Sequence, residues 1–210
     1  MTPETMTLTK ALVELKLLKK RINKKVEQLE VVVVKRGGVL PAAIKSEADF
    51  IRTTKADWQS LNALMSRRRK IKTALVVANA VTKVKIAGEE MTIAEAIERK
   101  SLVSTDRLIL NRLKFVLSQA QGKVDRHNRE LDERINQLLE TSYGNRESQL
   151  SKEDYERIAR PFKEGNTSVL IDPLNCATLM TKMEESVDAF ESEVDVALSI
   201  ANATTEISIS

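Results

Sequence analysis

The sequence predicts a mainly α fold, an elongated antiparallel helical bundle or coiled coil with a small β element formed by two short repeated strands. Its 210 residues are 30% charged and 3% aromatic, with six glycines and four prolines, which is typical of long amphipathic helices. Apolar residues recur at alternating steps of three and four over long stretches. Nearly the same phrase occurs twice, as VANAVTKVKI at 77–86 and IANATTEISI at 200–209, and each copy leads from a helix into an alternating strand.

The first helix is expected to begin near Thr7 and to pack along a partner helix through a heptad seam. Lys19 takes the one seam position that is not apolar. Val31–Val34 is either the frayed end of this helix or a short strand, and the Gly37-Gly38 pair breaks it. The predicted seam is Leu8, Leu12, Leu15, Ile22, Val26, Leu29 and Val33.

A second helix is expected from Thr54, whose hydroxyl can cap its first turn. The strand at 81–86 follows it, because apolar and polar residues alternate there, and Gly88 then allows a turn. The predicted apolar stripe of this helix is Trp58, Leu61, Met65, Ile71, Leu75 and Ala78.

The third helix is predicted to begin at a capping box formed by Thr92 and Glu95. Its apolar seam, which includes Leu110, Leu113 and Leu117, keeps a helical period toward Glu140. It is therefore either one helix of about 50 residues or a helix interrupted near 104–106 or at Gly122.

The region 142–172 is predicted to be irregular, with a short helix capped at Ser151 that stops before Pro161. Asp172 and Pro173 are expected to open the last helix as its cap and first helical residue. This helix carries an acidic outer face and the clearest heptad, formed by Cys176, Met180, Met183, Val187, Phe190, Val194, Ala197 and Ala201. The chain is thus divided into a helical bundle at 1–145, an irregular connector at 146–172 and a C-terminal heptad helix with its strand at 173–210.

The repeated phrase predicts two equivalent strands and hence a duplication. Asn79 and Asn202 suit helix exits, since asparagine tolerates the left-handed conformation found there. A lone strand is unstable in water, so the strands are expected to pair with each other or with copies in a neighbouring chain. A weaker echo joins MTLTKAL at Met6 to MTIAEAI at Met91. The candidate pairing residues are Val81, Val84, Ile86, Thr205, Ile207 and Ile209.

Charge is distributed unevenly along the chain. Residues 1–85 contain 19 Lys and Arg against 7 Asp and Glu, whereas residues 86–210 contain 15 against 23. The basic clusters are either a nucleic-acid footprint or a helix face that meets the acidic C-terminal helix of the same chain or of a neighbour. The second interpretation is favoured, because no aromatic residues interleave the clusters to stack bases. The candidate basic face is Arg67, Arg68, Arg69 and Lys70.

No residue pattern indicates catalysis, so an enzyme, a cofactor and a metal site are not expected. His127 is the single histidine, and no second His or Cys lies at metal-ligand spacing. Cys176 lies in a heptad seam, which favours a buried thiol over a nucleophile. There is no phosphate-binding loop, dinucleotide-binding turn or nucleophile elbow. Neither a membrane-spanning run nor a secretion signal is expected.

Three stretches resemble the septicolysin-like family of small helical proteins over about residues 6–135. They are MTLTKALVELKLLKKRI, ANAVTKVKIAGEEMTIAEAIERK and VDRHNRELDERI. The family label implies a pore-forming cytolysin. The C-terminal part from about Ser148 departs from that family and is similar in style to small helical proteins of tailed-phage structural gene clusters.

The predicted function is therefore a structural, non-enzymatic, homo-oligomeric assembly protein, as a phage virion component of the neck, collar or tail. Its expected partners are copies of itself and other virion structural proteins, in the virion or the host cytoplasm. The alternatives are a pore-forming or membrane-active protein of septicolysin type and a nucleic-acid-binding adaptor. Nucleic acid is the less favoured partner.

Overall fold

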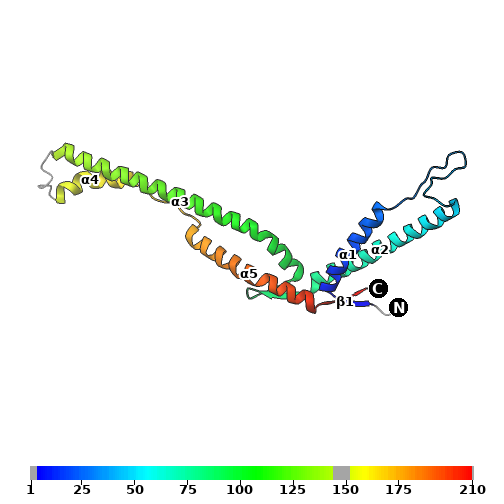
Figure 1. Cartoon of the computed structure of the whole chain (residues 1–210). Helices are drawn as coiled ribbons and strands as arrows, with labels where there is room; N and C mark the ends of the chain where they lie inside the picture. Colours follow the sequence, from blue (N-terminus) through cyan, green and yellow to red (C-terminus); the bar gives the residue numbers. More distant parts are fainter. Residues whose placement is uncertain (1–3, 144–151, 210) are drawn as a thin grey trace. The chain divides into compact units, whose positions relative to one another are not determined.

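The computed structural model describes residues 4–143 and 152–209, and it confirms that the fold is mainly α (Figure 1). In chain order the elements are β1 (Glu4–Thr7), α1 (Leu8–Glu27), α2 (Glu47–Val81), β2 (Lys83–Ile86), β3 (Glu89–Thr92), α3 (Ile93–Tyr143), α4 (Lys152–Asn166), α5 (Cys176–Thr204) and β4 (Glu206–Ile209). The chain divides into two compact units, residues 1–101 with 189–210 and residues 102–188. Both α3 and α5 contribute to each unit.

In the described part of the chain, the strands form two antiparallel pairs with unexpected partners. β1 pairs with β4, and β2 pairs with β3. The prediction that the two repeated strands pair with each other is therefore wrong within this chain. Each repeat also begins with a short strand, and these two, β1 (ETMT) and β3 (EEMT), supply the partners. Each contains a single apolar residue, so no alternating pattern marks them in the sequence.

The two strand pairs have the same register, which supports the predicted duplication. We define repeat 1 as β1, α1, α2 and β2, and repeat 2 as β3, α3, α4, α5 and β4. The strand that begins each repeat pairs with the strand that ends the other. The equivalent partners across the two ladders are Glu4–Ile209 and Glu89–Ile86, Met6–Ile207 and Met91–Val84, and Thr7–Glu206 and Thr92–Lys83.

The junctions between strands and helices also match. The backbone N–H of Leu8 donates to the carbonyl oxygen of Thr205 at 3.0 Å, and that of Ile93 donates to Thr82 at 2.9 Å. Met6 therefore corresponds to Met91 and Val84 to Ile207, and counting along the helices from these anchors gives the other equivalent positions.

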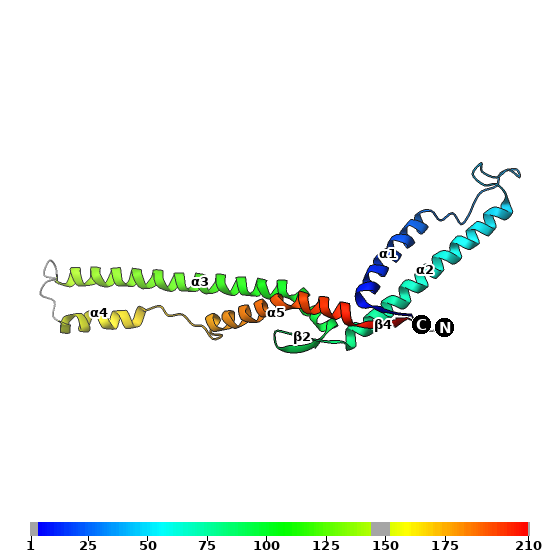
Figure 2. The same cartoon turned by 60° about the horizontal axis from the view of Figure 1, so that its bottom comes forward.

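α1 and α2 lie side by side as a helical hairpin (Figures 1 and 2). The face of α1 that packs on α2 differs in part from the predicted seam. Ala11 and Leu18 are buried there, whereas Leu12 and Val26 are 40% and 55% exposed. The predicted seam and the buried face both recur at steps of three and four, and α1 has apolar residues on both. The periodicity alone therefore did not show which of the two faces is buried.

α2 begins earlier than expected, at Glu47. The Ser46 hydroxyl accepts the backbone N–H of Asp49 at 3.2 Å, and the acidic residues of the first turn lie at the positive end of the helix dipole. Thr54 is inside the helix, where its hydroxyl donates to the carbonyl oxygen of Glu30 at 3.2 Å.

α3 runs without interruption from Ile93 to Tyr143, and its predicted capping box is confirmed. The backbone N–H of Glu95 donates to the Thr92 hydroxyl at 3.2 Å, and the Thr92 N–H donates to the Glu95 carboxylate at 2.6 Å. This second bond holds the pKa of Glu95 below its usual value.

The predicted irregular connector is largely helical, because α4 occupies residues 152–166. α4 does not stop before Pro161 but continues through it to Asn166. A proline inside a helix removes one backbone hydrogen bond without always ending the helix. The contact between α3 and α4 in the second unit is formed by Leu131, Ile135, Leu139 and Ala159.

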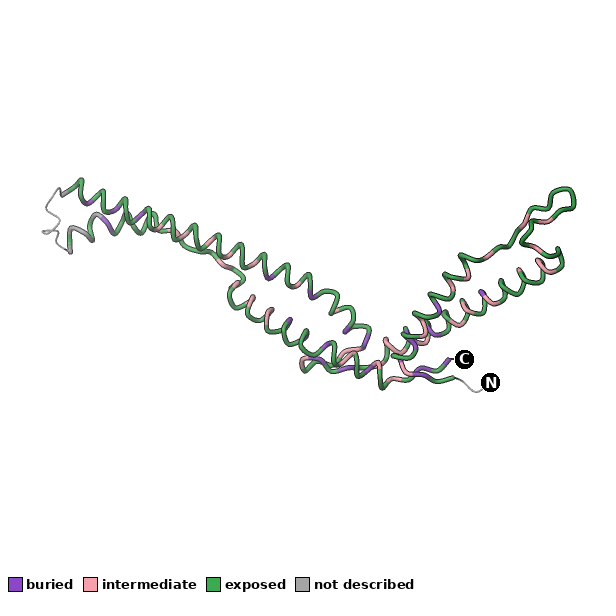
Figure 3. Tube along the Cα trace, in the orientation of Figure 1, coloured by how far each residue is buried: buried purple, intermediate pink, exposed green. Residues whose placement is uncertain are grey.

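The heptad of α5 is confirmed, since Val187, Phe190 and Val194 are buried at the expected spacing. On the other helices, too, buried residues are isolated from one another along the chain by exposed residues (Figure 3). The helix begins at Cys176 and not at Pro173. Asn175, with φ of 50°, has a left-handed conformation that a helix cannot include.

The acidic face of α5 is directed at α3 and not at the basic residues of α1 and α2. Each of three carboxylates along α5 forms an ion pair with a cation on α3. These pairs are Asp195 with Lys100, Asp188 with Arg107 at 2.8 Å, and Glu184 with Lys114.

Candidate interaction surfaces

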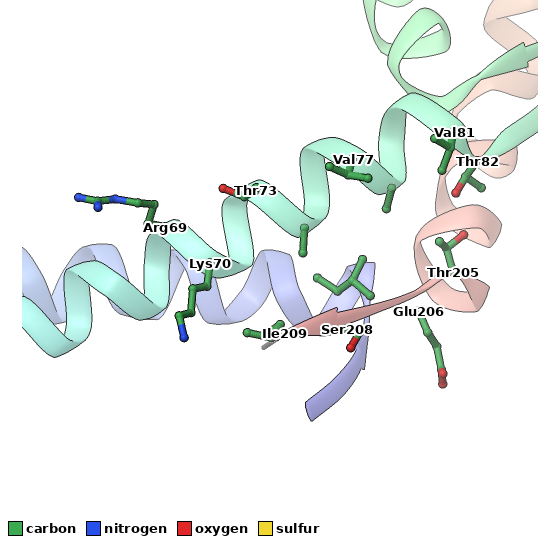
Figure 4. A pocket seen from close by; sticks show the side chains of 13 residues that line it. Arg69, Lys70, Thr73, Val77, Val81, Thr82, Thr205, Glu206, Ser208 and Ile209 are labelled. Atoms are coloured by element: carbon green, nitrogen blue, oxygen red, sulfur yellow. The ribbon is translucent and has the colours of Figure 1, made fainter. Parts of the chain in front are cut away.

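The two sets of predicted interaction residues meet at a groove between α2 and β4 in the first unit (Figure 4). Its volume is about 610 Å³. Val77 and Val81, which are 58% and 68% exposed, give it apolar surface, while Arg69 and Lys70 lie toward one end. From the predicted sets, the groove is lined by Arg69, Lys70, Val81, Thr205, Ile207 and Ile209.

Not every predicted pairing residue lies in a strand or faces this groove. Val81 is the last residue of α2. Val84 and Ile86 lie in β2, where their side chains are buried. Ile207 and Ile209 are also largely buried, so the apolar residues of both repeated strands belong to the core of the first unit.

Arg67 is held in an internal ion cluster, so it is not part of an open basic face. Its Nε donates to Glu14 at 2.5 Å, and its two terminal nitrogens donate to the Glu4 carboxylate at 2.8 and 3.0 Å. These bonds raise the pKa of Arg67 and lower that of Glu4. Arg67 thus joins α2 to both α1 and β1.

Repeat 2 contains a counterpart of this cluster with the arginine on the other helix. Arg99 of α3 stands at the position equivalent to Glu14, and Phe190 of α5 stands at the position of Arg67. The Arg99 guanidinium lies 4.6 Å from the centroid of the Phe190 ring, and it donates to Glu89 of β3 at 2.5 Å. In both repeats an arginine therefore connects the helix pair to the strand that begins the repeat.

Arg68, Arg69 and Lys72 border a second groove, of about 460 Å³, between α1 and α2. Among the described residues, none forms an ion pair or hydrogen bond with the side chains of Arg68, Arg69, Lys70 or Lys72. Of the predicted basic face, Arg68, Arg69 and Lys70 therefore have no such partner among the described residues, whereas Arg67 is paired. The groove has Ile22, Val26 and Met65 as its apolar floor and Arg68, Arg69 and Lys72 along its rim.

A third surface is an apolar stripe on α3 in the second unit, which we call the outer stripe. Its residues form two rows in which apolar side chains recur every seven positions, so they share one face of the helix. One row is Leu102, Ile109 and Val116, and the other is Leu108 and Phe115. Arg112 lies 5.5 Å from the ring of Phe115 within this face. The exposed fractions are Leu102 48%, Leu108 69%, Ile109 44%, Phe115 55% and Val116 46%.

The residues considered for chemistry have structural contacts. The Asp172 carboxylate accepts the backbone N–H of Cys176 at 2.8 Å. The neighbouring Asp172 carboxylate also raises the pKa of the Cys176 thiol. His127 Nδ1 lies 3.4 Å from the Ser168 hydroxyl. Across residues 4–143 and 152–209, no three His, Cys, Asp or Glu side chains gather so that they could hold a metal ion.

The chain matches no protein-family model and no curated protein. It is similar to a solved structure described as a functionally unknown conserved protein from Corynebacterium diphtheriae, with 17% sequence identity and a TM-score of 0.43. The similarity covers 97% of this chain and 99% of that one. Within the described residues, no helix combines the length and apolar character needed to cross a membrane.

The outer stripe and the floor of the α1–α2 groove were not identified from the sequence. The predicted seam of α3 used Leu110, Leu113 and Leu117, which face inward. The outer stripe is a second set of apolar residues at seven-residue spacing in the same helix, and this spacing was the sequence signal that could have identified it. The groove residues Val26 and Met65 were read as seam positions, so their exposure was not anticipated.

Proposed function

We propose that this protein is a structural, non-enzymatic assembly protein that forms homo-oligomers through the outer stripe of α3. The observation that carries the proposal is the exposure of five large apolar side chains on one face of a regular helix. About half of each is exposed, so the stripe presents roughly 500 Å² of apolar side chain if such groups expose on the order of 200 Å² when free. A patch of about this size on a monomer often marks an interaction site.

A second copy of the chain is the partner that suits the stripe best. Arg112 is its one charged residue, and it is stacked on Phe115, so neither an acidic nor a basic partner is favoured. Two stripes related by a two-fold axis can lie antiparallel with Leu102 opposite Val116 and Ile109 opposite itself. Together they would bury about 1,000 Å², the lower limit for a stable interface.

The test is the oligomeric state of the full chain and of the double variant Leu108→Ser with Phe115→Ser. Both side chains are more than half exposed, so the helical content of the variant should be unchanged by circular dichroism. We expect the wild type to sediment as a dimer or larger species at about 100 µM, a concentration at which even a Kd near 10 µM gives mostly dimer. The variant should sediment as a monomer.

A matched control is Val76→Ser with Val196→Ser, two exposed valines on α2 and α5 outside the stripe. This control should keep the wild-type sedimentation. A monomeric wild type, or the same oligomer in wild type and stripe variant, would contradict the proposal.

The role in a phage virion is a further proposal that rests on the resemblance of the C-terminal part to phage structural proteins. Co-assembly with such proteins into a ring would support it. Release of dye from liposomes would instead favour the pore-forming alternative. Binding to DNA that weakens steeply with salt would favour the nucleic-acid adaptor.

A further inference from the structure

The groove between α1 and α2 has cations that nothing in the described chain neutralises. Arg68, Arg69 and Lys72 stand along its rim, while Ile22, Val26 and Met65 form its floor. The acidic side chains near this hairpin are mostly engaged elsewhere, since Glu14 binds Arg67, Asp57 binds Lys25 and Glu47 binds Lys35.

Comparison with the other repeat shows that the charge on the second helix is inverted. At three alternate positions, a cation of α2 is equivalent to a carboxylate of α5. They are Arg68 and Glu191, Lys70 and Glu193, and Lys72 and Asp195.

These three carboxylates of α5 have partners within the chain, whereas among the described residues Arg68, Lys70 and Lys72 do not. Asp195 pairs with Lys100 of α3, and Glu193 accepts the backbone N–H of Ala87 at 2.6 Å. The position on α1 equivalent to Lys100 is Leu15, so Lys72 has no counterpart on the neighbouring helix. At Arg68, Lys70 and Lys72, repeat 1 therefore lacks opposite charges like those that α3 supplies in repeat 2.

We propose that the α1–α2 groove binds an acidic amphipathic helix of a partner protein. Carboxylates on the flanks of that helix would pair with Arg68, Arg69 and Lys72, and its apolar side chains would cover Val26 and Met65. The partner is a different protein and not a second copy. The acidic helix of a second copy is α5, where four carboxylates already bind α3 and Ala87: Glu184, Asp188, Glu193 and Asp195. This surface is separate from the outer stripe and does not depend on it.

The floor of the groove favours a helix over a nucleic acid. A phosphate backbone requires cations but makes no use of the exposed Val26 and Met65, which are 55% and 43% exposed. Stacked bases need aromatic side chains, and none is found among the described residues that line the groove. An amphipathic helix requires both features together, so the two ligands predict different responses to mutation.

The experiment measures binding of a fluorescent synthetic peptide by anisotropy, with the full-length protein. The peptide has about three heptads, with leucine at positions a and d and glutamate at the flanking positions. A single-stranded DNA oligonucleotide with the same label serves as the second probe.

Two double variants separate the charged rim from the apolar floor. Arg68→Glu with Lys72→Glu should weaken peptide binding about tenfold or more, with the larger loss at low salt. Val26→Ser with Met65→Ser should also weaken it about tenfold, and this loss should persist at high salt. All four side chains are exposed, so the helical content should be retained.

The control is Lys123→Glu with Arg126→Glu, which makes the same change of charge at exposed positions of α3. It should change the peptide affinity less than about twofold. The proposal is overturned if the wild type does not bind the peptide, if the floor variant binds it as tightly as the wild type, or if the control loses as much affinity as the rim variant. Tight DNA binding that is lost in the rim variant and unaffected in the floor variant would show instead that the face binds nucleic acid.

Discussion

Repeat 1 and repeat 2 share their strand register and their helix junctions but differ in the charge of their helix faces. In both repeats a threonine at the end of the first strand caps the helix that follows, and every second residue of the last strand is buried. Around this common frame, the Arg67 cluster of repeat 1 is replaced by the Arg99 and Phe190 pair of repeat 2. Backbone pairing and caps are thus shared by the two repeats, while the charge of their exposed helix faces differs.

The largest expected effect is a loss of stability when the buried isoleucine that ends a repeat is shortened, and its size should differ between the two repeats. Ile86 is fully buried, whereas its equivalent Ile209 is 8% exposed. Ile86→Ala should lower the free energy of unfolding by about 3 kcal/mol, because it leaves a closed cavity, and Ile209→Ala should lower it less, because that side chain is not fully enclosed. Urea denaturation of both variants tests this order. A larger loss for Ile209→Ala would mean that the closing strand is the more tightly packed one.

The helix caps give the next comparison. The Thr92 hydroxyl accepts the N–H of Glu95 at 3.2 Å and also donates to the Glu95 carboxylate at 2.9 Å. Thr7 has Lys10 at the corresponding position, so its hydroxyl only accepts the Lys10 N–H, at 3.3 Å. Thr92→Ala should therefore cost about 1–2 kcal/mol of unfolding free energy and Thr7→Ala about 1 kcal/mol or less. The same denaturation experiment measures both. Equal losses would indicate that the bond from the Thr92 hydroxyl to the Glu95 carboxylate contributes nothing.

The frame was only partly visible in the sequence. The α5 heptad was predicted because Val187, Phe190 and Val194 form an unambiguous apolar line. The repeated strands were recognised from their phrase, but their partners were not, since β1 and β3 lack alternation and β1 pairs with residues about 200 positions away.

The candidate surfaces were harder to predict than the fold. Arg67 to Lys70 look alike in the sequence, yet only Arg67 meets two carboxylates. Which cations remain unpaired depends on the angle of each side chain around α2 and on what α1 and β1 place opposite. An amphipathic pattern also does not reveal which of two apolar faces is buried, so the outer stripe became apparent only from exposure.

The two arginine clusters should contribute similarly despite their different chemistry. Arg67→Met removes bonds to Glu4 and Glu14, and Arg99→Met removes the contact with Phe190 and the bond to Glu89. Each should cost about 1 kcal/mol or less, since these partly exposed groups are screened by solvent. Thermal unfolding of both variants provides the measurement. A loss of stability in only one of the two variants would show that the two clusters do not play equivalent structural roles.

A small pH dependence should accompany the Arg67 cluster. The pKa of Glu4 is lowered from its ordinary 4.5 by the bond to Arg67, so its contribution is present above pH 4.5 and is lost as the pH falls through the lower folded-state pKa. Between about pH 5 and pH 3, where carboxylates titrate, unfolding free energy should fall less in Arg67→Met than in the wild type. If the unfolding free energy depends on pH identically in the two proteins, the Glu4–Arg67 bond is not the source of this pH dependence.

The central claim is that each repeat is closed by a strand of the other, and directed disulfide formation tests it most directly. In a Cys176→Ser background, Thr5→Cys with Ser208→Cys places two thiols directly opposite each other in the β1–β4 ladder. Lys85→Cys with Ser208→Cys instead places them at equivalent positions of the two repeated strands. On mild oxidation we expect the first pair to form a disulfide within one chain, seen by non-reducing electrophoresis and mass spectrometry, and the second pair to stay reduced. An intrachain bond in the second pair, or covalent dimers in place of the intrachain bond in the first, would contradict the account.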